Sequence, residues 1–377
     1  MRIEKRHMIS ALLGVGLAAL LIWKAPSNSP IEGESAVTKP HPGEFYDRPQ
    51  DARSSGALHP SREERRVAAY YRNEGKIFGT YYNIRYEAPA DLHDSIKAAL
   101  QAFDNSLSMF TPHSVLSAVN ANRDTTTDAL FEAMWTEATE IYALSGGAFD
   151  ITVAPLVKAF GFGRKSDQLS AISPQTIDSI RSFVGFDKVK LVDHHVCKSN
   201  PHVQIDGGAV AKGQACDVIA GLLYEHGCSN YLVDIGGEVV ARGVNDKGEP
   251  WRIGITKPNL NNEGAQEELQ EILAVSDIHM ATSGNYRNFY YAGSERRSHT
   301  IDPRTGYPVQ HSLLSATVVS SSCMRADALA TACMVLGEEE ALNMIERAQD
   351  AACYLIVAKK DSLTVITSPK WEKMIAK

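Results

Sequence analysis

One helix-like motif pairs a carboxylate with a hydroxyl. The stretch 325–332 (RADALATA) carries Asp327 and Thr331 four residues apart, so a helix would place both side chains on one face. Such hard oxygen donors suit Mg²⁺, and no His/Cys set with zinc spacing is present. The motif is therefore a candidate magnesium site. The alternative is an acid favoured by the helix dipole, with the Thr in the core.

A second motif combines glycines with a lysine. In 203–217 (VQIDGGAVAKGQACD) we expect a strand to deliver Asp206 into a Gly-Gly turn, after which small residues and Lys212 open a helix. Glycine lets a ligand approach the backbone, a helix start attracts phosphate, and a lysine adds a point charge. The stretch is neither a dinucleotide fingerprint nor a Walker loop. It predicts an anion site or, alternatively, a tight turn with a solvated lysine.

A third motif joins a histidine to a carboxylate. In 298–306 (SHTIDPRTG), His299 and Asp302 are three apart on an expected turn. A histidine that titrates near neutral pH beside a carboxylate is a candidate proton acceptor. The alternative is a structural Asp-Pro turn with an exposed histidine. No GxSxG or HExxH motif occurs, so serine-hydrolase and zinc-protease chemistry has no support.

A fourth stretch is aromatic and glycine-rich. In 145–163 (SGGAFDITVAPLVKAFGFG), a Gly-Gly turn precedes Phe149 and Asp150, and the run ends in two further phenylalanines. Apolar clefts with a few polar groups bind flat ligands, so this stretch is a candidate cleft wall. Plain core packing is the alternative.

The elements that must position these motifs mix strands and helices. Helical spacing covers 91–103, 127–144, 217–226 and 324–336, whereas β-type runs cover 76–86, 231–240, 251–255, 315–320, 353–358 and 363–366. Because no regular βαβ period links them, we predict an α+β fold.

Composition excludes several classes of protein. The chain has 377 residues with 44% hydrophobic and 22% charged residues, which is ordinary globular usage. Its 38 Lys and Arg against 45 Asp and Glu give a net charge of −7. Without a concentrated basic face, nucleic acid is not an expected partner. The six cysteines show no metal spacing and are expected to be mostly small buried residues.

The N-terminus has the layout of an export segment. We divide the chain into a signal peptide or membrane anchor at 1–24, a flexible linker at 25–62 and one large domain at 63–377. Residues 8–23 are uncharged after a basic start, and a Pro- and Ser-rich stretch follows them. This apolar run is at the short edge for a membrane span. A cleaved signal, an uncleaved membrane anchor and a buried helix remain open.

Taken together and in order, the motifs resemble the ApbE family of FAD:protein FMN transferases. The matching stretches are FGTYYNIRY, SLSMFTPHSVLSAVN, SGGAFDITVAPLVKAFGFG, VQIDGGAVAKGQACD, YLVDIGGEVVARG, MATSGNYRNFY, HTIDPRTGYPVQH and RADALATACMVLG. The resemblance implies a T-fold-like α+β architecture and a periplasmic location, anchored or secreted. It also implies Mg²⁺-dependent transfer of FMN from FAD to a threonine hydroxyl of an exported flavoprotein, with release of AMP. Subunits of ion-pumping electron-transfer complexes are the implied targets.

The same resemblance assigns site residues. FAD would contact Phe78, Phe110, Ala148, Phe149, Asp150, Asp206, Lys212 and the backbone near Ile301. The metal would be held by Asp327, Thr331 and the carbonyl of Ala209. For the proton of the threonine hydroxyl, the third motif itself supplies His299 as the candidate base, with Asp302 orienting it or substituting for it. Two alternatives remain open: a Mg²⁺-dependent FAD pyrophosphatase that gives FMN and AMP, and a non-catalytic flavin carrier.

Overall fold

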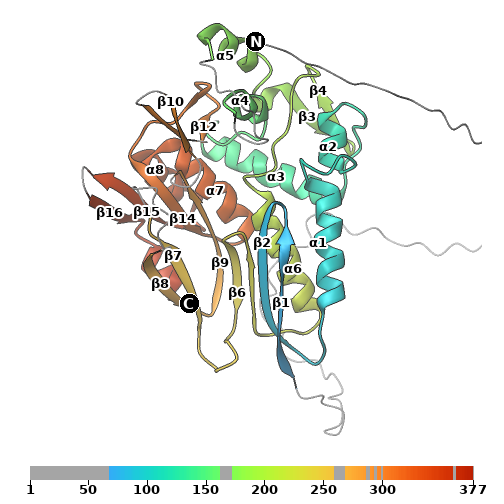
Figure 1. Ribbon diagram of the computed structural model, residues 1–377, viewed down its shortest axis with the longest axis vertical. Helices are drawn as coiled ribbons and strands as arrows, with labels where there is room; N and C mark the ends of the chain where they lie inside the picture. Colours follow the sequence, from blue (N-terminus) through green and yellow to red (C-terminus); the bar gives the residue numbers. More distant parts are fainter. Residues whose placement is uncertain are drawn as a thin grey trace, which may run out of the picture. The chain divides into compact units, whose positions relative to one another are not determined.

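An eight-stranded antiparallel sheet organises the domain (Figure 1). The computed structural model describes residues 68–161, 172–258, 268–285, 289–292, 295–298, 300–359 and 362–376. The strand order is β1-β2-β5-β6-β9-β14-β15-β16. These strands span β1 Ala69–Ile77, β2 Thr80–Ala88, β5 Tyr231–Ile235, β6 Glu238–Arg242, β9 Asp277–Gly284, β14 Leu313–Val319, β15 Ala352–Lys359 and β16 Ser362–Thr367.

In the described ranges, the remaining elements are helices and four two-stranded ribbons. The helices are α1 His93–Leu107, α2 Val115–Asn120, α3 Ala129–Leu144, α4 Ala154–Ala159, α5 Pro174–Arg181, α6 Ala211–Glu225, α7 Cys323–Leu336, α8 Glu338–Ala348 and α9 Trp371–Ile375, with a 3-10 turn at Phe186–Lys188. The ribbons pair β3 Val189–Val192 with β4 His195–Lys198, β7 Trp251–Thr256 with β8 Leu269–Val275, β10 Phe289–Ala292 with β11 Glu295–Ser298, and β12 Ile301–Asp302 with β13 Tyr307–Pro308.

Helices α6, α7 and α8 lie directly on one face of the sheet, where α8 contacts β15. α6 contacts β5 and β6, and α7 contacts β9 and β14, while α1 and α3 pack outside them. Nearly every residue of α7 is buried, which agrees with its lack of a polar face. The helix predicted at 324–336 is therefore confirmed. A helix this enclosed carries a carboxylate only where a partner compensates its charge.

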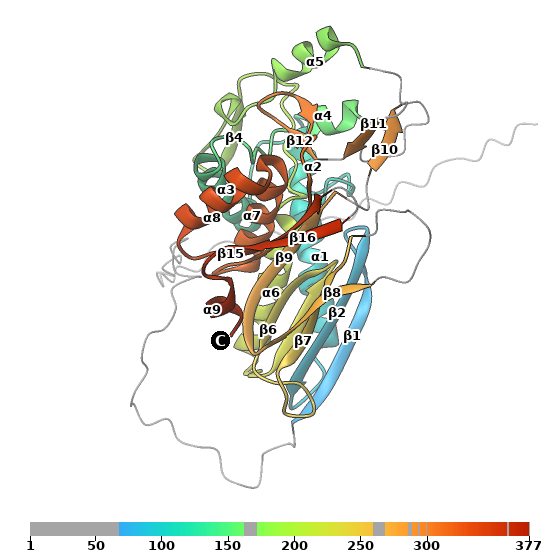
Figure 2. The same cartoon turned by 90° about the vertical axis from the view of Figure 1, so that its left-hand side faces the viewer.

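The opposite face of the sheet is covered by the β7–β8 ribbon and by α9 (Figure 2). The aromatic side chains of Trp251 and Trp371 are almost fully buried there, at 4% and 1% exposure. A smaller apolar cluster joins α4 and α5 to β12 through Phe160, Ile177 and Ile301. The helix layer and the ribbon thus enclose the sheet, and the loops at one end are left to form the site.

Two of the predicted strands are hairpins. The run at 76–86 turns at Phe78 and Gly79, which both have positive φ, so β1 and β2 pair with each other. The run at 231–240 likewise turns at Gly236 and Gly237. In each case the predicted β-type run is confirmed, and it contains two antiparallel strands with the turn between them. Glycine makes a left-handed turn accessible at both places.

The strand predicted at Val203–Asp206 is absent from the described structure. This segment is irregular, and the side-chain amide of Asn120 replaces a strand partner. Its Nδ2 donates to the Ile205 carbonyl at 2.7 Å and its Oδ1 accepts from the Ile205 N–H at 2.7 Å. The following helix begins at Ala211, which agrees with the helix start predicted around Lys212, whereas the helical spacing alone indicated only 217–226. Ile205 is thus held by the end of α2, and the Asp206 N–H donates to the Ile151 carbonyl at 2.6 Å.

The large antiparallel sheet with segregated helices confirms the α+β prediction. Five of the six cysteines are buried, Cys197 is exposed, and none forms a disulfide; all six lie in the described ranges. Within the residues that the structure describes, no helix combines the length and apolar character needed to cross a membrane. The apolar segment 8–23 lies outside those residues.

Candidate active site

A pocket of about 810 Å³ opens between strands β5, β6 and β9, helices α6 and α7, and the surrounding loops. Its lining includes nearly all of the site residues named from sequence: Phe78, Phe110, Ala148, Phe149, Asp150, Asp206, Ala209, Lys212, Ile301, Asp327 and Thr331. Phe78 and Asp327 are separated by most of the domain's sequence, so only the tertiary fold brings them together. A pocket of this size is within the range of sites for cofactor-sized ligands.

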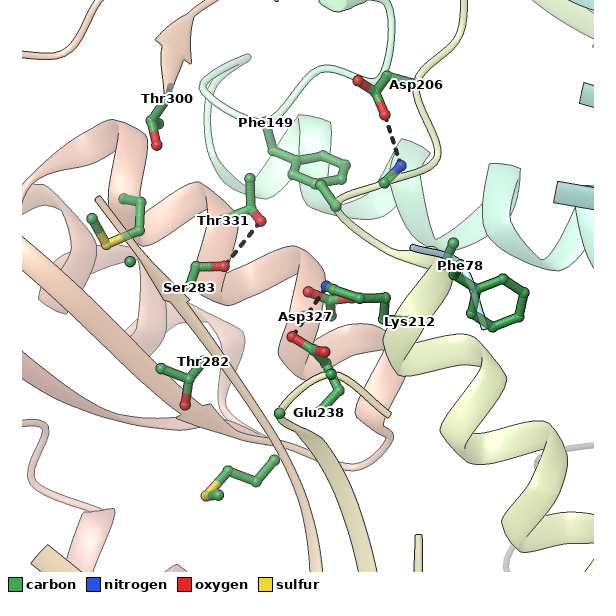
Figure 3. A pocket seen from close by; sticks show the side chains of 18 of the residues that line it. Phe78, Phe149, Asp206, Lys212, Glu238, Thr282, Ser283, Thr300, Asp327 and Thr331 are labelled. Carbon is green, nitrogen blue, oxygen red and sulfur yellow. Dashed lines mark hydrogen bonds and ion pairs between the residues drawn. The ribbon is translucent and has the colours of Figure 1, made fainter. Parts of the chain in front are cut away.

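The floor of the pocket is a lysine between two carboxylates (Figure 3). Lys212 Nζ lies 3.1 Å from Glu238 Oε1 and 3.5 Å from Asp327 Oδ2. Glu238 and Asp327 are only 2% and 1% exposed, whereas the Lys212 side chain is 30% exposed. Three separate elements, α6, β6 and α7, each contribute one of these groups.

The pKa values of this cluster reflect its burial. Burial raises the pKa of Glu238; the ammonium of Lys212 opposes that effect and the Asp327 carboxylate adds to it. Burial alone would lower the pKa of Lys212, but Asp327 and Glu238 raise it above the ordinary value for lysine. The ammonium is therefore held charged, and one ammonium serves two carboxylates. A further cation at the pocket floor would reduce the cost of burying the second negative charge.

A glycine allows α6 and α7 to approach closely enough for these contacts. The Gly213 N–H donates to Asp327 Oδ2 at 3.1 Å. A Cβ atom at Gly213 would overlap the backbone carbonyl of Cys323 and lie 2.9 Å from the Asp327 Cβ. The absent side chain thus fixes the spacing between Lys212, which precedes it, and Asp327.

We expect Gly213→Ala to destabilise the domain by about 1–3 kcal/mol, because overpacking forces the two helices apart. Gly221→Ala on the same helix is the matched control, since a Cβ there meets nothing within 4 Å. Chemical denaturation measures both. Equal stability of the two variants would contradict the close approach described for Gly213.

The loop from α3 to α4 is fastened by Asp150. Its Oδ1 accepts the Thr152 N–H and hydroxyl, each at 2.7 Å, and its Oδ2 accepts the Phe186 N–H at 3.1 Å. Burial raises the pKa of Asp150, although these hydrogen bonds oppose the effect. Both oxygens are occupied within the protein, so Asp150 holds the loop that presents Ala148 and Phe149 to the pocket.

Asp206 and the aromatic residues lie around the pocket wall. Asp206 Oδ1 accepts the Gly208 N–H at 2.7 Å, which fixes the glycine turn before α6. Phe78 packs on Phe103 with ring centroids 5.3 Å apart, in a left-handed backbone conformation that is rare for a bulky residue. Phe110 is 54% exposed, so the pocket offers an aromatic surface to a flat ligand.

Of the predicted acid–base pair, His299 and Asp302, the structure describes only Asp302. His299 lies outside the described residues. Asp302 is bound by Arg304, whose Nε lies 3.0 Å from Oδ1 and whose Nη2 lies 3.0 Å from Oδ2. Its neighbours Ile301 and Pro303 line the pocket, but Asp302 is not among the described lining residues. In this arrangement both Asp302 oxygens are engaged by a cation on their own turn.

Sequence reasoning did not single out several further residues that line the pocket, among them Glu238, Ser283 and Arg252. Glu238 carries the strongest sequence clue, since it is the single acid in the otherwise apolar strand EVV that follows a Gly-Gly turn. Ser283 Oγ lies 3.3 Å from Thr331 Oγ1. The stretches containing Glu238 and Ser283 were matched as family motifs, but no individual residue was selected from them.

The lining is rich in hard oxygen donors and negative charge. Its described carboxylates are Asp150, Asp206, Asp234, Glu238 and Asp327, against the cations Lys212 and Arg252. No three His, Cys, Asp or Glu side chains gather as a metal-binding group in the described ranges. The described lining therefore carries five carboxylates against two cations.

The chain is similar to known proteins in sequence and in fold. The model of the ApbE family matches residues 78–355. The chain is 34% identical to the FAD:protein FMN transferase of Haemophilus influenzae, over 80% of this chain and 90% of that protein. Its fold resembles the flavin transferase ApbE from Vibrio cholerae, with a TM-score of 0.74 and 32% identity over 81% of this chain and 99% of the other.

A second solved structure, the apo flavinyl transferase ApbE of Pseudomonas stutzeri, is similar with a TM-score of 0.73 and 29% identity. The similar region covers 82% of this chain and 98% of the Pseudomonas stutzeri chain. The matched region contains the hairpin with Phe78, the α6 and α7 motifs and the whole described pocket floor. The chain therefore belongs to the ApbE family.

Proposed function

We propose that this protein is a FAD:protein FMN transferase that moves FMN from FAD onto a threonine hydroxyl of a target protein. The names of its relatives support the FAD and FMN parts of this proposal. The observation that carries it is the gathering of the family motifs around one pocket, with a cationic and acidic floor and aromatic walls. Such a pocket suits a ligand with a flat ring system and a pyrophosphate.

Mg²⁺ fits the residues at the pocket floor. Asp327 and Thr331 lie on one face of α7, and Glu238 Oε2 is a buried carboxylate oxygen without a hydrogen-bond partner. The lining carboxylates would repel a pyrophosphate that arrived without a cation. We infer that Asp327, Thr331 and the Ala209 carbonyl hold Mg²⁺. When bound, Mg²⁺ neutralises phosphate oxygens and stabilises the leaving group.

In the proposed reaction, the threonine oxygen forms a bond to the FMN phosphorus and the pyrophosphate P–O bond breaks. AMP leaves with the former bridging oxygen, and the threonine proton passes to a base. Lys212 supplies a fixed positive charge to the phosphates, while Phe78, Phe110 and Phe149 provide the surface for the ring. Catalysis of this kind depends mainly on positioning and charge neutralisation. His299 remains the proton acceptor proposed from sequence.

We further propose that the reaction takes place on the exported side of a bacterial membrane. The support is the uncharged segment 8–23 after a basic start. The proposed targets are exported flavoproteins, such as subunits of ion-pumping electron-transfer complexes. Whether 1–24 is removed or retained as an anchor is tested by sequencing the N-terminus of the membrane-associated protein, where a start near Ala25 would exclude the anchor.

The transferase is tested by incubating the full domain with FAD, Mg²⁺ and an exported flavoprotein domain. Intact-protein mass spectrometry follows the target, and chromatography follows AMP. We expect the target to gain one FMN, and chelation with EDTA to abolish that gain. AMP release with no modification of any offered target would indicate a FAD pyrophosphatase instead. Intact FAD under all conditions would indicate a flavin carrier.

A further inference from the structure

The carboxylate of Glu238 has an incomplete set of partners. Oε1 contacts the Lys212 ammonium at 3.1 Å, but Oε2 is buried and has no hydrogen-bond partner. A buried carboxylate oxygen without a partner is costly, so its presence in the pocket floor calls for a reason. Figure 3 shows Glu238, Lys212 and Asp327 directed toward one another.

The backbone of Glu238 is fixed by the same helix that carries Lys212. Lys212 and Cys216 are four residues apart on α6 and so share a face. The Cys216 thiol donates to the Glu238 carbonyl at 3.2 Å, while Lys212 binds the Glu238 carboxylate. Pairing with Ile235 across the β5–β6 turn adds a third restraint. Glu238 is therefore a rigid anchor for the lysine rather than a mobile surface acid.

The distances indicate what this anchor does. Lys212 lies closer to Glu238 (3.1 Å) than to Asp327 (3.5 Å), so its ammonium is divided between two carboxylates. If Glu238 were neutral, Asp327 would be the single anion available to Lys212 within the cluster. The lysine would then compete directly with a cation for Asp327.

We propose that Glu238 is a positioning residue that acts through Lys212. It retains the ammonium in the pocket so that the Asp327 carboxylate is free to hold Mg²⁺ when FAD binds. This inference rests on the proposed function for the identity of the ligand and the cation. In this role Glu238 neither contacts FAD nor coordinates the metal.

The test is a Mg²⁺ titration of FAD binding, followed by flavin fluorescence in the full domain. We expect Glu238→Gln to raise the Mg²⁺ concentration for half-maximal FAD binding by about tenfold or more. Glu238→Asp, which keeps the charge, should restore most of the lost affinity because the lysine stem can follow the shorter side chain. Glu225→Gln, at the exposed end of α6, is the matched control and should leave the titration unchanged.

A double-mutant cycle separates action through Lys212 from direct attraction of the cation. In a Lys212→Met background, the effect of Glu238→Gln should shrink by about tenfold, since contacting residues show coupled effects of that order. Equal effects in both backgrounds would overturn the proposal, because Glu238 would then act without the lysine. FAD binding in EDTA is a further readout for Glu238→Gln. A general packing defect would weaken FAD binding without Mg²⁺, whereas the proposal expects FAD binding without Mg²⁺ to be no weaker than in the unaltered protein.

The Mg²⁺ titration tests the role of Glu238 independently of whether a target protein is modified. Mg²⁺-dependent FAD binding with the expected cycle, but without FMN transfer to any target, would contradict the proposed function and sustain the inference. FMN transfer by the unaltered protein, together with an unchanged Mg²⁺ titration in Glu238→Gln, would sustain the function and overturn the inference. FAD binding that does not respond to Mg²⁺ in the unaltered protein would also overturn it.

Discussion

Replacing Asp327 with Asn is expected to lower the rate of FMN transfer by about a thousandfold, which corresponds to about 4 kcal/mol of lost transition-state stabilisation. The amide keeps an oxygen that can accept the Gly213 N–H, now bonded to Asp327 at 3.1 Å. It removes the charge that attracts the cation. The domain should therefore fold while its metal-dependent activity is lost.

The measurement is FMN attachment and AMP release over a range of Mg²⁺ concentrations, with thermal unfolding as the check on folding. Asp246→Asn is the control, because Asp246 is exposed and outside the pocket lining. Full activity in Asp327→Asn would exclude Asp327 as an essential metal ligand. If Asp327→Asn does not fold, the same measurement is made on Thr331→Val, which removes the second proposed side-chain ligand of the metal.

Replacing Lys212 with Met should affect both stability and activity. Glu238 and Asp327 are nearly fully buried, and Lys212 is the cation recorded in contact with both in the described structure. Removing one partner from such a cluster costs about 3 kcal/mol or more, because the remaining charges are buried without compensation. We expect a lower melting temperature in EDTA, with partial recovery on adding Mg²⁺, since a ligand of the native state stabilises it.

FMN transfer by Lys212→Met should fall by about a hundredfold or more, because a charged contact to the phosphates is lost. Lys212→Arg retains the charge and should recover stability better than activity, since a planar guanidinium does not reproduce the geometry of an ammonium. An unchanged melting temperature for Lys212→Met in EDTA would show that the two carboxylates do not depend on the lysine.

Nearly all of the site residues named from the ordered motifs line the pocket, because each motif is a local pattern. The four-residue spacing of Asp327 and Thr331 places them on one helical face whatever surrounds the helix. The glycines before Lys212 likewise indicate a turn at the start of a helix. Asp327, Thr331 and Lys212 all line the pocket. Strand boundaries were less predictable, since Phe78 adopts a left-handed conformation that its residue type disfavours.

The errors have long-range causes. The segment at Val203–Asp206 reads as a strand, but its backbone is satisfied by Asn120, 85 residues from Ile205. Glu238 was overlooked because its importance comes from Lys212 and Asp327, which lie on other elements. A carboxylate after a Gly-Gly turn is unremarkable until the cation beside it is known.

By itself, the sequence determined the family, the α+β class and the side chains that could bind a phosphate and a cation. These follow from residue type and short spacing, which the chain carries locally. Only the tertiary structure decided that Lys212 is shared between Glu238 and Asp327 and that Gly213 sets the distance between α6 and α7. Packing decides such pairings, because burial makes each charge depend on whichever partner the fold brings within reach.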